Sequence, residues 1–326
     1  LRSYDFSQLC IWQAYLRGAD LAGLNFSHAD FTGSVFTDYA GSVTAVAFSP
    51  DGQLLAAGAD SGVIYLWRVA DRQLLAICQG HTSHVWSLAF SPDGRQLLSG
   101  SGDATVRLWD IATQQLLRLF VGHMGGVSTV SFHPGGELIA SGSLDKQVRI
   151  WHKVTGQLLQ TLAAENAKVE AIAFAPDRHP LWGTDGTLLA VGGHDQVVRL
   201  WDWQQGQIVR TLQGHTNLIK VVGFCPQPQW INGSRRSLVV SGGDDQVLRV
   251  WDAATGEVLH CLTGHTAALI SLTFSPDGAH LFSGSDDQTI RVWDLQSGQT
   301  VRILHGHYGT VRSLAVQPQA APDQPL

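Results

Sequence analysis

Tryptophan recurs along this chain at an almost constant interval. Six of the eleven tryptophans are separated by 42, 42, 50, 50 and 42 residues, at Trp67, Trp109, Trp151, Trp201, Trp251 and Trp293. The two longer intervals each carry eight extra residues at the same place, around 178–185 in one copy and 227–236 in the next. A fixed period of this length indicates a repeat protein whose units stack on their neighbours.

One copy of the repeat reads as four short strands. Residues 85–90 alternate in polarity, Ser91-Pro92-Asp93-Gly94 is turn chemistry, and 96–100, 105–109 and 115–120 are again extended and apolar. No segment longer than ten residues has a helical period. The repeat therefore predicts an antiparallel four-stranded meander.

Two short motifs recur at fixed places in this pattern. Gly-His pairs end at His81, His123, His215, His265 and His307, and Trp-Asp pairs begin at Trp109, Trp201, Trp251 and Trp293. Over residues 41–316 the chain resembles WD40 repeats. This resemblance implies an all-β protein with a WD40 β-propeller fold.

Closure of the ring leaves two alternatives. Strands assigned by register give six complete four-stranded blades between 43 and 304, a further innermost strand at 311–316 and a further outermost strand at 34–37. In WD40 proteins a terminal strand commonly completes the last blade, so we expect a seventh blade closed with the N-terminal segment. A six-bladed ring is the alternative. The expected domains are an N-terminal segment (1–38), the propeller (39–316) and a flexible C-terminal tail (317–326).

The N-terminal segment has a different period. Between residues 4 and 38 an apolar residue recurs every five positions, at Phe6, Ile11, Leu16, Leu21, Phe26, Phe31 and Phe36. The ADLAG and ADFTG segments, at Ala19 and Ala29, resemble pentapeptide repeats, whose family fold is a β-helix with four fives per coil. Seven fives make fewer than two coils, so we expect this segment to lean on the propeller as a cap. An independent binding role is the alternative.

The resemblance also implies a structural tetrad in each blade. In WD40 repeats a Trp indole bonds a Ser hydroxyl, the Ser bonds a His, and the His bonds an Asp. The matching residues here are Trp109, Ser99, His81 and Asp103; Trp151, Ser141, His123 and Asp145; Trp251, Ser241, His215 and Asp245; and Trp293, Ser283, His265 and Asp287. The first blade, with Tyr39, Ala57 and Ser61, and the fourth, with Glu165 and Val191, depart from the pattern.

Nothing in the sequence indicates an enzyme. A Ser, His and Asp set repeated in four blades favours a structural role, because one active site needs only one set. The nucleophile-elbow, zinc-protease and phosphate-loop motifs are absent from the sequence. We therefore expect no catalytic residue, no cofactor and no metal.

Partner binding is expected at positions that vary between copies. In WD40 domains these lie on the narrow face, three and five residues beyond the Gly-His histidine and one before the tetrad aspartate. The resemblance transfers them to Asp60, His84, Trp86, Lys168, Glu170, His194, Leu218, Lys220, Asp244, Ile270, Asp286 and Arg312. Trp86 is the strongest candidate anchor, because Trp, Tyr and Arg dominate interface energies.

The two insertions predict a second surface. They connect first and second strands of adjacent blades, so we expect two loops side by side on the wide face. Their aromatic and basic residues are Trp182, Trp230, Arg235 and Arg236. An interface and mutual packing of the two loops are equally open.

The charge and the cysteine content limit the classes of partner and the cellular compartment that the sequence favours. The net charge is −6 with no run of Lys and Arg, which gives no basis for binding nucleic acid. No stretch reaches the roughly 18 apolar residues of a membrane span. The four cysteines show no CxxC spacing. We expect a cytoplasmic protein with neither nucleic acid nor membrane as partner.

The combination of segments carries one further resemblance. A WD40 array preceded by pentapeptide repeats is similar to the C-terminal part of bacterial STAND/NACHT-type signalling proteins. This implies a non-catalytic scaffold or sensor module that binds a protein or peptide, with a nucleotide-binding domain upstream in the same polypeptide. The alternatives are a propeller enzyme with a central-channel site, where Glu170 is the one acidic residue of the innermost strands, and a self-assembly module.

Overall fold

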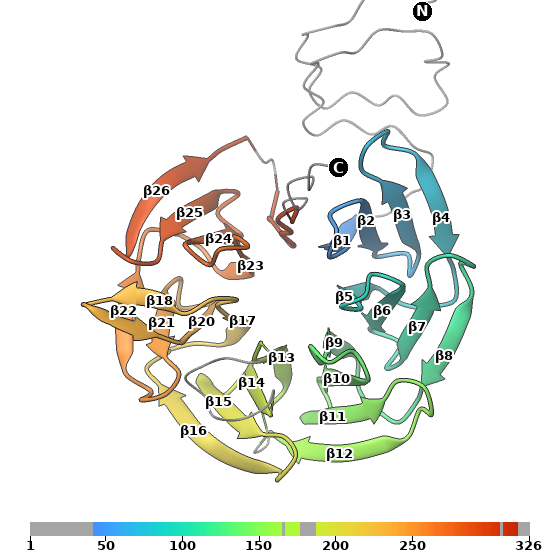
Figure 1. The fold of residues 1–326 in the computed structure, drawn as a ribbon, viewed down its shortest axis with the longest axis horizontal. Coiled ribbons are helices and arrows are strands. Elements are labelled where there is room, and N and C mark those ends of the chain that lie inside the picture. Colours follow the sequence, from blue (N-terminus) through green and yellow to red (C-terminus); the bar gives the residue numbers. More distant parts are fainter. Residues whose placement is uncertain (1–41, 165–166, 177–186, 307–308, 319–326) are drawn as a thin grey trace, which may run out of the picture.

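The computed structural model describes residues 42–164, 167–176, 187–306 and 309–318. These residues form six four-stranded antiparallel sheets, and the strands within each sheet lie in chain order from the centre outward. The sheets are arranged around a central axis (Figure 1). This confirms the predicted all-β propeller of four-stranded blades.

The first three blades contain no insertion. Blade 1 consists of β1 (Val43–Phe48), β2 (Leu54–Ala59), β3 (Ile64–Arg68) and β4 (Leu74–Cys78). Blade 2 consists of β5 (Val85–Phe90), β6 (Gln96–Ser101), β7 (Val106–Asp110) and β8 (Leu116–Phe120). Blade 3 consists of β9 (Val127–Phe132), β10 (Leu138–Ser143), β11 (Gln147–His152) and β12 (Leu158–Ala163).

Blades 4 and 5 carry the two insertions. Blade 4 consists of β13 (Val169–Phe174), β14 (Leu188–Gly193), β15 (Val197–Asp202) and β16 (Gln207–Gln213). Blade 5 consists of β17 (Ile219–Phe224), β20 (Leu238–Gly243), β21 (Leu248–Asp252) and β22 (Val258–Leu262), with a hairpin of β18 (Gln229–Ile231) and β19 (Ser234–Arg236) after β17. Blade 6 consists of β23 (Leu269–Phe274), β24 (His280–Ser285), β25 (Ile290–Asp294) and β26 (Gln299–Leu304).

Turn chemistry ends the strands where the sequence predicts. In the turn after β5, the Ser91 hydroxyl donates to Asp93 (2.5 Å) and accepts from the Gln96 amide (2.9 Å). Gly94 has a φ of 71°, which glycine adopts at little cost. The Ser-Pro-Asp-Gly sequence therefore specifies this turn locally.

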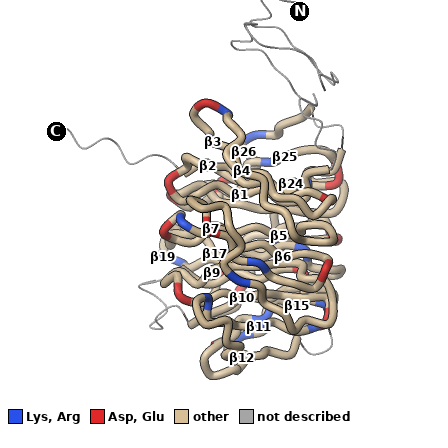
Figure 2. The backbone as a smooth tube through the Cα atoms, turned by 90° about the vertical axis from the view of Figure 1, so that its right-hand side faces the viewer, with Lys and Arg blue, Asp and Glu red and all other residues tan. Residues whose placement is uncertain are grey.

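The core lies between the blades. Five clusters of buried apolar residues each join two consecutive blades. The cluster between blades 5 and 6, for example, contains Val250 and Leu262 of blade 5 with Leu281 and Trp293 of blade 6. Apolar residues on the facing sides of these consecutive sheets thus become buried, and Figure 2 shows acidic and basic residues interspersed along the chain.

The segment 309–318 lies between blades 6 and 1. The Val311 amide donates to the Ser285 carbonyl (3.2 Å), the Ser271 hydroxyl donates to the Val311 carbonyl (3.2 Å), and the Ser313 hydroxyl accepts from the Val46 amide (3.0 Å). The predicted innermost strand at 311–316 occupies this place but is not a strand. A strand requires a paired neighbour, and none adjoins 311–316 among the described residues.

Two expectations concern the chain ends. The segment 1–38 and its closing strand at 34–37 lie outside the described residues. Of the tail expected to be flexible, Gln317 is described, and its side-chain amide donates to the Gly52 carbonyl in the turn after β1 (3.1 Å).

Candidate functional site

Every innermost strand contains a β-bulge near its start. In β1 the register passes from Val43 opposite Ala59 to Ala45 opposite Gly58, which leaves Thr44 as the extra residue. The same shift in the other five blades leaves Trp86, Ser128, Glu170, Lys220 and Ile270. A bulge redirects the side chain of its extra residue.

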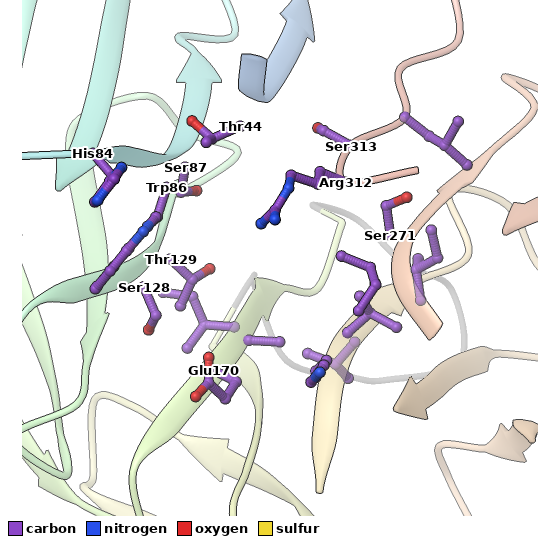
Figure 3. Close-up of a pocket in the computed structure, with 18 of the residues that line it drawn as sticks. Thr44, His84, Trp86, Ser87, Ser128, Thr129, Glu170, Ser271, Arg312 and Ser313 are labelled. Carbon is purple, nitrogen blue, oxygen red and sulfur yellow. The ribbon is translucent and has the colours of Figure 1, made fainter. Parts of the chain in front are cut away.

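The six bulged side chains line one central cavity of about 750 Å³. Arg312 enters the cavity from the segment 309–318, opposite Trp86 and Glu170 (Figure 3). Of the predicted narrow-face residues, the cavity is lined by Asp60, His84, Trp86, Glu170, Lys220, Ile270 and Arg312. One residue per blade thus faces the same space.

The other predicted narrow-face residues lie beside this ring. The backbone N–H of His194 donates to the Lys168 carbonyl (3.1 Å), and that of Asp244 donates to the Leu218 carbonyl (2.9 Å). The Asp286 N–H makes the equivalent bond to the Ala268 carbonyl (2.9 Å). These bonds hold the turn residues next to the starts of the innermost strands.

Two pairs of polar side chains on this face contact each other within the chain. Lys220 Nζ lies 2.8 Å from Asp244 Oδ1, and His194 Nε2 lies 2.7 Å from Glu170 Oε1. These contacts form because the bulge places each side chain beside the turn residue of its own blade. From the sequence, Lys220 is expected to meet carboxylates, and Asp244 basic groups, of a partner, and this stays a prediction. Arg312, in contrast, has no ion pair among the described residues.

Trp86 lies over two glycines. A Cβ added at Gly126 would clash with Trp86 Cζ3, and one at Gly102 would lie 3.3 Å from Cζ2. The ring therefore needs glycine at these neighbouring positions, and 37 % of Trp86 stays exposed. Met124 of blade 3, which the sequence reasoning did not single out, is 91 % exposed. Its signal was the Met after Gly-His, where three other copies have Thr.

The predicted tetrads are hydrogen-bonded in four blades. In blade 2 the Trp109 indole N–H donates to Ser99 Oγ (2.9 Å), Ser99 Oγ lies 2.8 Å from His81 Nε2, and His81 Nδ1 lies 2.8 Å from Asp103. The same contacts, at 2.7–2.9 Å, occur in blades 3, 5 and 6. An ionised Asp103 carboxylate can only accept a hydrogen bond, so a neutral imidazole carries its proton on Nδ1, and Nε2 accepts the hydrogen of the Ser99 hydroxyl.

Burial and hydrogen bonding set the charges of the tetrads. Burial lowers the pKa of His81, His123 and His265 and outweighs the opposing effect of the neighbouring carboxylates. Burial alone would raise the pKa of Asp103, but hydrogen bonds from Thr105 and His81 outweigh it and lower that pKa to about 2. A neutral imidazole therefore donates to a carboxylate in the buried corner of the blade.

The two departing blades use other contacts. In blade 4, Val191 and Trp201 are both buried in the same apolar cluster, and Arg199 bonds Asp195 at 2.5 Å. In blade 1, the rings of Tyr65 and Trp67 lie 5.6 Å apart. Tyr39 and Glu165 lie outside the described residues.

The insertion 227–236 forms a hairpin rather than a loop. Its turn residues Asn232 and Gly233 both have positive φ, 52° and 75°, as in a type I′ turn. Asn-Gly between short strands is a hairpin signal that the sequence reasoning missed. Trp230 is 60 % exposed. Arg236, which the sequence offered as a cation for a partner, pairs with buried Asp252 (2.5 Å). Trp182 lies outside the described residues, so the packing of the two insertions stays a prediction.

The described residues offer neither a metal cluster nor a membrane span. Within the described ranges no group of three or more His, Cys, Asp or Glu side chains is arranged to hold a metal ion. In the same part of the chain no helix is long and apolar enough to cross a membrane.

Comparison with protein families matches two kinds of repeat. The model described as WD domain, G-beta repeat matches residues 32–68, 72–110, 114–152, 156–202, 206–252 and 256–294. The model described as pentapeptide repeats (8 copies) matches residues 5–38.

Similar curated proteins share only part of the chain. The uncharacterized WD repeat-containing proteins alr2800 and alr3466 of Nostoc sp. (strain PCC 7120) are 44 % and 42 % identical over 85 residues. These residues are 26 % of this chain and 7 % and 6 % of the two proteins. WD repeat-containing protein 86 of Homo sapiens is 43 % identical over 51 residues, 16 % of this chain and 14 % of that protein. The chain thus matches a small part of each relative's length.

Proposed function

Because the chain belongs to the WD40 repeat family, we propose that it is a non-catalytic scaffold that binds a protein or peptide over the central cavity. The observation that carries this proposal is the bulge ring, which consists of the six bulged residues around the cavity: Thr44, Trp86, Ser128, Glu170, Lys220 and Ile270. Six blades with the same framework each direct one side chain into one cavity, and these side chains differ in every blade. A constant framework with variable contact residues suits recognition.

The cavity mouth favours a partner with two kinds of group. Trp86 rests on glycines and offers an exposed aromatic face, with Met124 exposed on the next blade. Arg312 points into the cavity as an unpaired cation among the described residues (Figure 3). We therefore propose that an apolar side chain of the partner packs on Trp86 while a carboxylate meets Arg312.

The test compares a variant of the cavity with a variant outside both proposed binding surfaces. We expect the double variant Trp86→Ala, Arg312→Glu to lose proteins that the wild-type chain captures from its own cells, identified by mass spectrometry. The matched control is Val301→Ala, Arg302→Glu on the outermost strand β26, where both residues are exposed. Thermal unfolding checks that all three proteins are folded. Capture of the same proteins by the wild type and the cavity variant would reject this surface.

A catalytic role in the cavity is the alternative from a different class. Glu170 and His194 form one carboxylate–imidazole pair there, but the other bulged residues are Thr, Trp, Ser, Lys and Ile. Lys220 is paired with Asp244, and none of the other four residues is an acid or a base, so we favour binding. If Glu170→Gln abolished turnover of any compound by the purified protein, the enzyme interpretation would gain support.

The sequence resemblance leads to a finer proposal. We propose that the propeller serves as a sensor in a longer bacterial signalling protein with a nucleotide-binding domain upstream, located in the cytoplasm. The match to less than a tenth of the two Nostoc proteins supports a modular role, and Cys78, Cys225 and Cys261 are unpaired thiols. The full reading frame of the gene tests the upstream domain, and cell fractionation tests the location.

We also propose that the N-terminal segment 1–38 closes the boundary between blades 6 and 1. Leu304, the last residue of β26, is 38 % exposed, whereas Leu262 at the same register of blade 5 is 2 % exposed. The segment precedes β1 in the sequence, and the family match to the first repeat begins at residue 32. A double-mutant cycle between Phe36 and Leu304 tests this cover.

A further inference from the structure

The hairpin of β18 and β19 leaves blade 5 at the end of β17 away from the bulge ring. Lys220 stands at the start of β17 and faces the central cavity, whereas the hairpin follows Phe224 at the other end. Figure 2 shows β19 at the left-hand edge of the molecule in side view. The hairpin is therefore separate from the proposed binding cavity.

Three contacts fix the hairpin to the propeller. Ile231 is 0 % exposed and belongs to the core cluster between blades 5 and 6. The Gln229 side-chain amide donates to the Asp277 carbonyl of blade 6 (3.0 Å), and Arg236 pairs with Asp252 of blade 5. The hairpin is thus tied to both blades, and its Asn-Gly turn is in the conformation that this sequence favours.

The opposite face of the hairpin is exposed in the part of the chain that the structure describes. Trp230 and Arg235 are direct cross-strand partners, so their side chains project from the same face. Trp230 is 60 % exposed, and Arg235 is exposed with no ion pair among the described residues. The anchored residues Gln229, Ile231 and Arg236 fill the other side of the hairpin.

We infer that this hairpin is a second docking surface, for a protein segment that places an apolar side chain on Trp230 and a carboxylate beside Arg235. Trp and Arg are the residues that most often dominate interface energies. The anchors hold them in place before binding, so little conformational entropy is lost when a partner docks. The free guanidinium requires an acidic complement, because burying it unpaired would be costly.

An anionic membrane is the less suitable occupant. Asp277 on the adjoining turn is exposed, and the net charge of the chain is −6. With the Asp277 carboxylate nearby and a negative net charge, one aromatic and one basic residue give little attraction to anionic lipid. A protein partner with both an apolar and an acidic group fits the hairpin better.

The experiment selects peptide ligands from a random library. The wild-type chain is immobilised and used for the selection, and a Trp230→Ala, Arg235→Glu variant removes peptides that bind elsewhere. We expect the selected peptides to share an aromatic or aliphatic residue next to Asp or Glu. Calorimetry with one such peptide should show roughly tenfold weaker binding for Trp230→Ala and for Arg235→Glu, with no change for Trp86→Ala.

A charge reversal and a vesicle assay complete the test. Arg235→Glu should regain binding when the acidic residue of the peptide is replaced by Lys, which a merely structural role of Arg235 would not produce. Selected peptides that lack the acidic residue, or that bind Trp230→Ala as well as wild type, would overturn the inference. Sedimentation with vesicles of phosphatidylserine and phosphatidylcholine that Trp230→Ala abolishes would overturn it in favour of a membrane. Loss of cavity binding by Trp86→Ala, Arg312→Glu is measured separately, so the two surfaces fail independently.

Discussion

The boundary between blades 5 and 6 and the boundary between blades 6 and 1 are built from matching residues but differ in burial. At the first, Leu262, Leu281 and Trp293 are 2 %, 0 % and 1 % exposed. At the second, the equivalent Leu304 is 38 % exposed, and Leu55 and Trp67 are half-buried. The strand registers are the same in both places. Strand pairing within a blade therefore does not depend on the neighbouring blade, whereas burial of its faces does.

Blades 6 and 1 also differ in their tetrads. Blade 6 has a complete tetrad that satisfies the Trp293 indole, while blade 1 has Ala57 in place of the Ser. Both blades nevertheless form four strands with a bulge at the same place. The tetrad thus stabilises one corner of a blade and is not needed to form it.

The largest expected effect is on the two tryptophans. Trp293→Ala should lower the free energy of unfolding by about 3 to 5 kcal/mol, because it empties a buried site and leaves Ser283 without its donor. Trp67→Ala should cost less, because Trp67 is already half-exposed. Urea denaturation of both variants measures the difference, and equal losses would show that the two boundaries are equally closed.

The matched leucines come next. Leu262→Ala should lower the free energy of unfolding by about 2 to 4 kcal/mol. For Leu304→Ala the loss should depend on Phe36, if the N-terminal segment covers this boundary as proposed. A double-mutant cycle in the full chain should give a coupling of roughly 0.5 to 2 kcal/mol between Phe36→Ala and Leu304→Ala.

The control for this cycle is the pair Phe36→Ala and Leu262→Ala. These two substitutions should be additive, since Leu262 already packs against blade 6. Additivity in both cycles would contradict the proposed cover.

The tetrad of blade 6 gives a smaller effect. His265→Ala leaves the buried Ser283 and the Asp287 carboxylate without their shared partner. We expect a loss of about 1 to 3 kcal/mol in the free energy of unfolding, with partner capture unchanged in the folded protein. The exposed His305→Ala is the control. A variant that kept its melting temperature but lost its partners would instead assign His265 to binding.

Acid should weaken the tetrads in two steps. The pKa of His81, His123 and His265 is lowered from 6.5 by folding, so the unfolded chain binds protons first and stability falls as the pH drops below about 6.5. The pKa of Asp103 and Asp245 is lowered from 3.8 to about 2, so their contribution is lost between these values. Urea midpoints measured across this range test the order, and His265→Ala should reduce the first step. A midpoint that stayed constant from neutral pH to about 5 would contradict the first step.

Local patterns in the sequence predicted much of the fold. Trp spacing, Ser-Pro-Asp-Gly turns and alternating strands predict the six four-stranded blades, and the strands begin and end close to the predicted residues. Asn232-Gly233 carried equally local information about the hairpin, which the sequence reasoning did not use. The predicted strand at 311–316 failed because strand formation requires a neighbour that a local pattern does not contain.

The candidate site was predictable in part. The repeat identifies Trp86, Glu170 and Lys220 as variable positions, because they differ while their surroundings stay constant. It does not show that a bulge turns each of them into one cavity, or that Lys220 pairs with Asp244. Lys220 and Asp244 stand at positions that differ between copies, so the repeat contains no recurring pattern from which their pairing could be predicted.

The sequence by itself determined what repeats: the strand pattern, the turns and the residues of the four tetrads, since these depend on contacts within one blade. The tertiary structure decided what differs around the ring. It determined which charges stay unpaired among the described residues, as at Arg312 and Arg235. It also determined which apolar side chains are buried against a neighbouring blade: Leu262 is buried in this way, and Leu304 is not among the described residues. The physical reason is that the hydrogen bonds of turns and tetrads form within one repeat, whereas burial of an apolar face requires a neighbouring blade, and the exposure of a charge depends on what the fold places around it.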